Sequence, residues 1–144
     1  MKLSLIFTSI VVLLSSVRAI VPQQLISNPF YDNGNQIISE SGITCVGDFN
    51  ASAVFANIPY FPDLGGGPVV GHLSGLGCVA CAVLTNPNTG ATIVVPLVNF
   101  VSAYYEVSTA AMKNLLTNVS NSNPQAPLNV TVDITAPSEC NFPS

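Results

Sequence analysis

The chain has 144 residues, of which three are basic and seven acidic, so its net charge is −4. Nucleic acids and anionic lipid headgroups are bound through clusters of Lys and Arg, and with so few cations the sequence predicts no nucleic-acid partner and no membrane partner. Charged residues make up 7% of the chain and hydrophobic residues 49%, so Ser, Thr and Asn must supply most of the polar surface. Such a surface suits a neutral hydrogen-bonding ligand such as a sugar, or a protein that collects at interfaces.

The N-terminus has the pattern of a secretory signal peptide. Lys2 precedes an apolar run over residues 3–14, and Val17-Arg18-Ala19 then supplies the small residues that a signal peptidase reads. The run is shorter than the about 20 residues that span a bilayer, which disfavours a membrane anchor. We therefore predict a secreted protein with a signal peptide at 1–19 and a single domain at 20–144. Without the signal peptide one basic residue faces seven acidic ones, a net charge of −6.

Four cysteines and three glycosylation sequons lie in the predicted domain. The cysteines permit three disulfide pairings, among Cys45, Cys78, Cys81 and Cys140. The alternative, a redox dithiol at Cys78-Val79-Ala80-Cys81, needs a helix N-terminus and a nearby positive charge to lower a thiol pKa. Here β-forming residues follow and no basic residue is near, which favours structural disulfides. The Asn-x-Ser/Thr sequons agree with a secretory route, and they lie at Asn50, Asn118 and Asn129.

The middle of the chain carries a predicted break and then a predicted hairpin. Gly65-Gly66-Gly67-Pro68 is expected to be a break, where glycine lets the chain turn and approach another segment closely. The apolar segments 79–85 and 91–99 flank the turn residues 86–90. This arrangement predicts a hairpin of buried strands.

A short helix and a final strand are predicted after the hairpin. Ser108 is a suitable N-cap for a helix that ends by Asn118, and its apolar positions share one face: Ala111, Met112, Leu115 and Leu116. From 128 to 134 apolar and polar residues alternate, as in a half-buried strand with Asn129 facing solvent. Several short strands with one or two helices fit a small closed β-barrel.

A series of motifs gives the chain a family resemblance. In order they are Phe30-Tyr31-Asp32-Asn33-Gly34, Cys45, Asn57-Ile58-Pro59-Tyr60-Phe61-Pro62-Asp63-Leu64-Gly65-Gly66, Cys78-Val79-Ala80-Cys81, Ser108-Thr109-Ala110-Ala111-Met112 and Cys140. The chain resembles the cerato-platanin family of small secreted fungal proteins. The resemblance implies a mainly β fold, the six-stranded double-psi β-barrel shared with expansins. It also implies disulfides between Cys45 and Cys78 and between Cys81 and Cys140.

The residue types at the expected acid position argue against catalysis. Inverting glycosidases need two carboxyl groups about 6.5–9.5 Å apart. Where cerato-platanins commonly carry Asp and His, this chain has Asn99 and Phe100, and an amide does not transfer a proton near neutral pH. His72, the single histidine, lacks the spacing of a catalytic triad and the partners of a metal site. We therefore predict no enzyme activity, no metal and no cofactor.

Carbohydrate binding is the remaining chemistry, because flat aromatic faces with convergent polar groups bind sugars. Tyr31 and Asp32 match the Tyr-Asp-Asn-Gly of the family and are the first candidates. Tyr60, Asp63 and Asn99 would join them on a groove if the family fold holds. In the structural alternative, Tyr31 packs in the barrel and Asp32 accepts backbone bonds in an Asx-turn. The chain also departs from the second, upstream Tyr-Asp of the family, where it has Ser27-Asn28.

The resemblance implies a non-catalytic protein that binds chitin-type oligosaccharides, loosens cell walls as expansins do, and elicits host defence. The expected partners are N-acetylglucosamine oligomers or another wall polysaccharide, and host immune receptors. A second hypothesis is a surface-active or immunomodulatory protein with a decayed sugar groove, favoured by the absence of Trp and of the groove Asp. A third is a vestigial hydrolase.

Overall fold

The computed structural model describes residues 21–71, 78–120 and 122–142. The predicted signal peptide at 1–19 and His72 lie outside the described residues. Six strands, one α-helix and five 3-10 segments form the described chain. The strands are β1 (Gln23–Ser27), β2 (Gly65–Gly67), β3 (Ala80–Thr85), β4 (Thr92–Phe100), β5 (Tyr105–Val107) and β6 (Leu128–Thr135). The helices are α1 (Thr109–Leu115), η1 (Pro29–Asp32), η2 (Ile38–Glu40), η3 (Val46–Asp48), η4 (Phe55–Asn57) and η5 (Pro137–Cys140).

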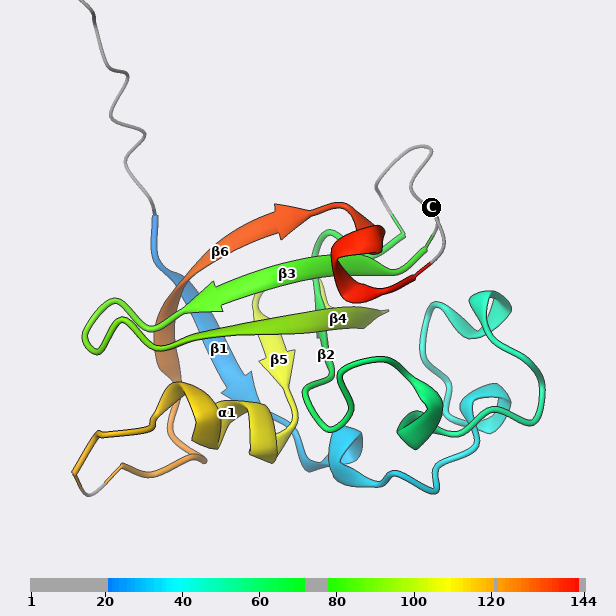
Figure 1. Ribbon diagram of the computed structural model, residues 1–144, viewed down its shortest axis with the longest axis horizontal. Helices are drawn as coiled ribbons and strands as arrows, with labels where there is room; N and C mark the ends of the chain where they lie inside the picture. Colours follow the sequence, from blue (N-terminus) through cyan, green and yellow to red (C-terminus); the bar gives the residue numbers. More distant parts are fainter. Residues whose placement is uncertain (1–20, 72–77, 121, 143–144) are drawn as a thin grey trace, which may run out of the picture.

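The strands close into a barrel in the order β1-β5-β2-β4-β3-β6 (Figure 1). Two neighbouring pairs, β1 with β5 and β2 with β4, run parallel, and the other pairs are antiparallel. This confirms the predicted six-stranded barrel. The short segments η2, η3 and η4, coloured cyan to green, lie together at one side of it. The seven-residue α1 packs near one end, and no helix in the described ranges is long and apolar enough to cross a membrane.

The predicted hairpin and helix are confirmed. β3 and β4 pair in register around the turn at 86–90, and β6 pairs with β3 on the other side. The hydroxyl of Ser108 accepts the backbone N–H of Ala111 at 3.0 Å, as an N-cap does. At the other end of α1, the buried amide of Asn86 donates to the carbonyl of Leu115 at 3.0 Å. The hairpin turn therefore satisfies a carbonyl that the helix terminus leaves open.

The predicted break at Gly65-Gly66-Gly67 is wrong, because these residues form β2, a buried strand of the barrel between β5 and β4. Glycine is depleted in strands, so local propensity gives no sign of this one. Close approach explains the choice of residue. A Cβ on Gly65 would lie 2.3 Å from the carbonyl oxygen of Glu106, and a Cβ on Gly67 would lie 2.6 Å from the ring of Tyr105. The expectation that the glycines admit another segment closely is confirmed.

Both predicted disulfides are present, and all four cysteines are paired. Cys45 is joined to Cys78 across 33 positions, and Cys81 to Cys140 across 59. The chain-entropy model gives about 4 kcal/mol of stabilisation for loops of these lengths. The second bridge anchors η5 to β3. The redox-dithiol alternative is excluded for this structure, since Cys78 and Cys81 belong to different bridges.

The core continues from the barrel into the segments beside it. Leu25, Leu84, Leu97 and Met112 are fully buried in the barrel and under α1. Outside the barrel, three rings pack together in one cluster: Phe30, Tyr31 and Phe55. This aromatic cluster fixes η1 against η4 and determines where the hydroxyl of Tyr31 lies.

Candidate ligand-binding site

One polar row crosses three neighbouring strands of the barrel. Glu106 on β5 and Asn99 on β4 both lie opposite Gly66 on β2, and we name these three residues the polar rung. The register shifts between Gly65 and Gly66, so that Asn99 rather than Val98 faces Gly66. This is the effect of a β-bulge, which re-aims a side chain. The bulge therefore brings the amide of Asn99 and the carboxylate of Glu106 into one row.

Gly66 leaves the centre of the polar rung open for a tyrosine hydroxyl. A Cβ at this position would lie 2.8 Å from the hydroxyl of Tyr31 and 2.8 Å from the carbonyl oxygen of Asn99. Real Cβ atoms are not found at such distances from backbone oxygen. Any larger residue at Gly66 would therefore have to displace Tyr31 or separate β2 from β4.

Glu106 is the acidic residue of the polar rung, and two donors hold its side chain. The hydroxyl of Tyr31 donates to Oε1 at 2.5 Å, and the amide of Asn28 donates to Oε2 at 3.0 Å. The side chain of Glu106 is buried, with 8% of the residue exposed. Hydrogen bonds to a carboxylate are stronger than neutral ones, so this pair of bonds fastens η1 to β5.

Tyr31 remains a neutral hydrogen-bond donor over the whole physiological range. Its burial raises the pKa of the phenol far above its ordinary value, and the hydrogen bond to Glu106 raises it further. The amide of Asn99 acts in the opposite direction by favouring the phenolate, but it is a smaller effect. The hydroxyl of Tyr31 thus donates to Glu106 and lies near the side chain of Asn99, the other side chain of the polar rung.

Asn99 is held on its other side by Thr44. The backbone N–H and the hydroxyl of Thr44 both donate to Oδ1 of Asn99 at 3.1 Å. The same hydroxyl accepts the backbone N–H of Phe100 at 2.9 Å. Phe100 is 40% exposed, and Tyr104, which is half-buried, lies close enough to influence the Tyr31 hydroxyl. Asn99 and Thr44 thus place an amide and a hydroxyl at the edge of the polar rung, and the backbone of Phe100 is bonded to the same hydroxyl.

The structure brings together two of the five predicted sugar-binding residues, Tyr31 and Asn99. Tyr31 is fully buried, so its hydroxyl, and not a ring face, is what it offers to the site. Asp32 accepts the backbone N–H of Thr109 at 2.9 Å, which is a contact with α1 and not the Asx-turn of the structural alternative. The roles of all five residues in sugar binding stay predictions.

The other two predicted residues, Asp63 and Tyr60, bond to different elements. The amide of Asn114 on α1 donates to Asp63 at 3.2 Å. Desolvation raises the pKa of Asp63, and the hydrogen bond from Asn114 opposes this. Tyr60 has a left-handed backbone with φ 68° and is 41% exposed, and its hydroxyl donates to the carbonyl of Glu139 in η5 at 3.2 Å.

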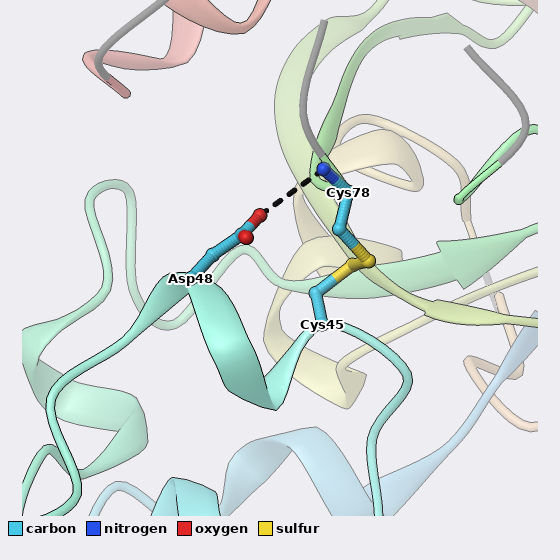
Figure 2. Close-up of side chains that lie close together, drawn as sticks. All are labelled: Cys45, Asp48 and Cys78. Carbon is cyan, nitrogen blue, oxygen red and sulfur yellow. Dashed lines mark hydrogen bonds between the residues drawn. A yellow bond between two sulfur atoms is a disulfide. The ribbon is translucent and has the colours of Figure 1, made fainter. Parts of the chain in front are cut away.

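A second cluster of possible ligand atoms surrounds the first disulfide. Figure 2 shows the carboxylate of Asp48 beside the bond between Cys45 and Cys78. Within the described residues, Cys45, Asp48 and Cys78 form the group whose possible ligand atoms lie close enough to share a metal ion, within 4.8 Å of one another. Its sulfur atoms, however, are bonded to each other and are not thiolates, the form that binds metals. Asp48 instead accepts the N–H groups of Cys78 and Val79 at 3.2 and 3.3 Å, so the cluster fastens η3 to the start of β3.

Three residues at or next to the site were absent from the sequence-based candidates: Thr44, Phe100 and Glu106. The sequence did carry a signal for Glu106, which is a lone acid between the β-prone residues Tyr105 and Val107. An acid in the middle of a strand is unusual and requires a partner when buried. Thr44 carried no comparable signal, because its contact with Asn99 joins positions 55 residues apart.

Similarity to known proteins is found among the solved structures, and these share one fold. No protein-family model matches the sequence, and no curated protein matches it. Among solved structures, cerato-platanin 3 of M. perniciosa superposes with a TM-score of 0.65 at 23% identity, over 84% of this chain and 99% of that one. Cerato-platanin 5 of the same organism gives 0.67 at 17% identity, over 86% and 95%. The solution structure of the fungal elicitor Cerato-Platanin gives 0.56 at 22% identity, over 83% and 98%.

Over the residues that the structure describes, the architecture is thus a small, disulfide-bonded, closed six-stranded barrel with one α-helix. The chain has the cerato-platanin fold.

Proposed function

We propose that the chain is a secreted, non-catalytic member of the cerato-platanin family that binds neutral oligosaccharides of the chitin type at the polar rung. The observation that carries this proposal is the row of Glu106, Gly66 and Asn99 with the Tyr31 hydroxyl between them. Amide, hydroxyl and carboxylate groups converge there, and sugar sites combine such groups with aromatic faces. The aromatic residues adjacent to the polar rung in the chain are Phe100, which follows Asn99 on β4, and Tyr104, which precedes β5.

Expansin-like wall loosening and perception by a host belong to the same proposal. One of the similar structures is described as a fungal elicitor, and both disulfides suit an extracellular protein. The sequons at Asn50, Asn118 and Asn129 are all exposed, as glycosylated residues must be. The predicted signal peptide supplies the route of export.

The way in which the acids are bonded supports the proposed absence of catalysis. Hydrolysis with inversion needs one carboxyl group as acid and a second as base. Glu106 accepts two hydrogen bonds from within the protein, and Asp32 and Asp63 are engaged with α1. Asn99 is in the position where the acid is expected. We expect no reducing ends from chitin or cellulose, and none after Asn99→Asp.

The test of binding is a titration of the labelled protein with N-acetylglucosamine oligomers, followed by nuclear magnetic resonance. The accessible edge of the polar rung, where Thr44 is exposed and Asn99 is half-buried, should bind with a Kd on the order of micromolar to millimolar, with saturable shifts at Thr44, Asn99 and Tyr104. Phe100→Ala and Tyr104→Ala should each weaken binding roughly fivefold, about 1 kcal/mol of lost aromatic contact. Ile134→Ala is the control, because Ile134 is an exposed apolar residue on β6, a strand that does not neighbour β2. No shifts at millimolar oligomer would refute the proposal.

A second candidate function is surface activity. Several large apolar side chains are exposed in the described structure: Val21, Ile37, Val46, Tyr60, Phe100, Val119 and Ile134. With few charges on the chain, they would favour adsorption at an interface between water and an apolar phase, or contact with an immune receptor. Surface-pressure measurements with Phe100→Ser and Val46→Ser distinguish this function, since Val46 should then matter as much as Phe100.

A further inference from the structure

A row of threonines crosses a different face of the barrel, on β6, β3 and β4. Thr131 lies opposite Thr85, and Thr85 lies opposite Thr92. The hydroxyls of Thr85 and Thr92 are 3.1 Å apart. The three strands lie side by side in Figure 1, and neighbouring strands are about 4.8 Å apart. Thr92 is exposed and the other two are half-buried, and the hydroxyl of Thr92 also donates to the carbonyl of Gly90 at 3.4 Å. The threonine row is therefore a short line of three threonines at the surface.

The sequon at Asn129 lies at one end of the threonine row. Asn129 and Thr131 are two residues apart on β6 and therefore face the same side of the sheet. Asn129 is exposed, while Val130 between them is buried. On the neighbouring strand β1, Gln24 lies opposite Asn129 and is also exposed. An attached group at Asn129 thus has a polar amide on one side and the threonine row on the other.

We propose that Asn129 carries an N-linked glycan whose inner N-acetylglucosamine residues lie over the threonine row. The donor is the lipid-pyrophosphate-linked oligosaccharide of the secretory pathway. The bond between the sugar C1 and the donor phosphate breaks, a bond between C1 and Nδ2 of Asn129 forms, Nδ2 loses a proton, and the lipid pyrophosphate leaves.

The chemistry of this face selects such an occupant. An N-acetylglucosamine unit offers hydroxyl, amide and carbonyl groups, which match threonine hydroxyls, and an apolar ring face for the neighbouring Val83 and Val94. Asp133, at the next position on this face of β6, disfavours an anionic ligand. A tethered sugar also has a high effective concentration at the row, so weak hydrogen bonds are sufficient to hold it.

The other two sequons lie in different surroundings. Asn118 has a left-handed backbone with φ 70° in the turn after α1, and Asn50 is in the loop after η3. Asn129 lies within a regular strand beside three in-register threonines. We therefore assign the packed glycan to Asn129.

The experiment uses the full chain secreted from yeast with Asn50→Gln and Asn118→Gln, so that Asn129 is the one sequon left. Intact mass before and after endoglycosidase H measures occupancy. The glycan is expected to raise the Tm by about 2–4 °C above that of the protein without a glycan, the effect of a few added surface hydrogen bonds. Thr85→Val and Thr92→Val keep the sequon and should remove most of this increase in Tm. In these variants, endoglycosidase H should also cut the glycan from the folded protein several-fold faster. Thr89→Val, in the hairpin turn, is the matched control.

Each outcome decides the proposal. An unmodified Asn129 overturns it at the first step. A glycan that gives the same increment in Tm and the same cleavage rate in the threonine variants overturns the packing on the row. If a valine variant fails to fold, the cleavage rates of Thr92→Ser and Thr92→Ala provide the comparison. Binding of oligosaccharides at the polar rung is measured separately with the Asn129→Gln protein, so failure of one proposal leaves the other intact.

Discussion

Two rows of side chains cross the same barrel, and both take a residue from β4. The polar rung contains Glu106, Gly66 and Asn99, and the buried Tyr31 hydroxyl fills its centre. The threonine row contains three identical residues, of which Thr92 is exposed. In the polar rung each group depends on a partner from a distant segment. In the threonine row the hydroxyls of Thr85 and Thr92 bond to each other at the exposed surface, where water can replace a lost partner.

This contrast shows where the protein is specific and where it is tolerant. A buried polar group that loses its partner costs the full desolvation penalty, whereas an exposed hydroxyl that loses its partner bonds to water. We therefore expect substitutions in the polar rung to be costly and substitutions in the threonine row to be nearly neutral. The following predictions test that difference.

The largest effect is expected for Gly66→Ala. The new Cβ would lie 2.8 Å from the carbonyl oxygen of Asn99 and from the Tyr31 hydroxyl, so β2 and β4 must separate. We expect a loss of about 3 kcal/mol or more in the free energy of unfolding, as for other overpacked core positions, measured by urea denaturation. Gly47→Ala is the control, because its Cβ would meet no atom within 4 Å. Equal stability of the two variants would contradict the described packing of β2.

Tyr31→Phe should have the next largest effect. It removes the hydroxyl that donates to Glu106 and leaves that carboxylate with one fewer donor. The expected loss is about 1–3 kcal/mol in the free energy of unfolding. Combining it with Glu106→Gln gives a double-mutant cycle, whose coupling energy should be about 0.5–3 kcal/mol if the two groups interact directly. Additive effects would show that the hydrogen bond contributes nothing.

Alkaline pH should destabilise the protein through the same tyrosine. Burial raises the pKa of Tyr31 in the folded state, while the unfolded chain loses this proton near pH 10. The folded state then holds more protons than the unfolded one, so stability is complete below about pH 10 and falls above it, by about 1.4 kcal/mol per pH unit for one tyrosine. Tyr31→Phe should make the dependence shallower. Tyr105, whose pKa is also raised by burial, adds to the remaining slope. An unchanged slope would contradict the assignment.

The smallest effect is expected for Thr85→Val and Thr92→Val in protein made without a glycan. Valine keeps the β-branched shape that suits a strand, and the lost hydroxyl bond is exposed. The free energy of unfolding should change by no more than about 0.5 kcal/mol. A loss comparable to that of Tyr31→Phe would remove the distinction between the two rows.

Local sequence patterns determined the elements that form from their own residues. The hairpin of β3 and β4, the capped α1 and the alternating β6 all follow from spacing and propensity. The motifs also led to the barrel and both disulfides. These features are readable because each depends on neighbours within a few residues, or on a pattern shared across a family.

The tertiary structure alone decided β2 and the candidate site. Three glycines have no side chains to show a pattern, so β2 forms because β4 and β5 leave room for a bare backbone. A continuous pairing register between β2 and β4 would place Val98 opposite Gly66. The bulge shifts this register, so that Asn99 lies there instead. Tyr31 and Glu106 meet across 75 positions, a contact that no local pattern encodes. The sequence thus supplied the chemical groups, and long-range packing brought them together.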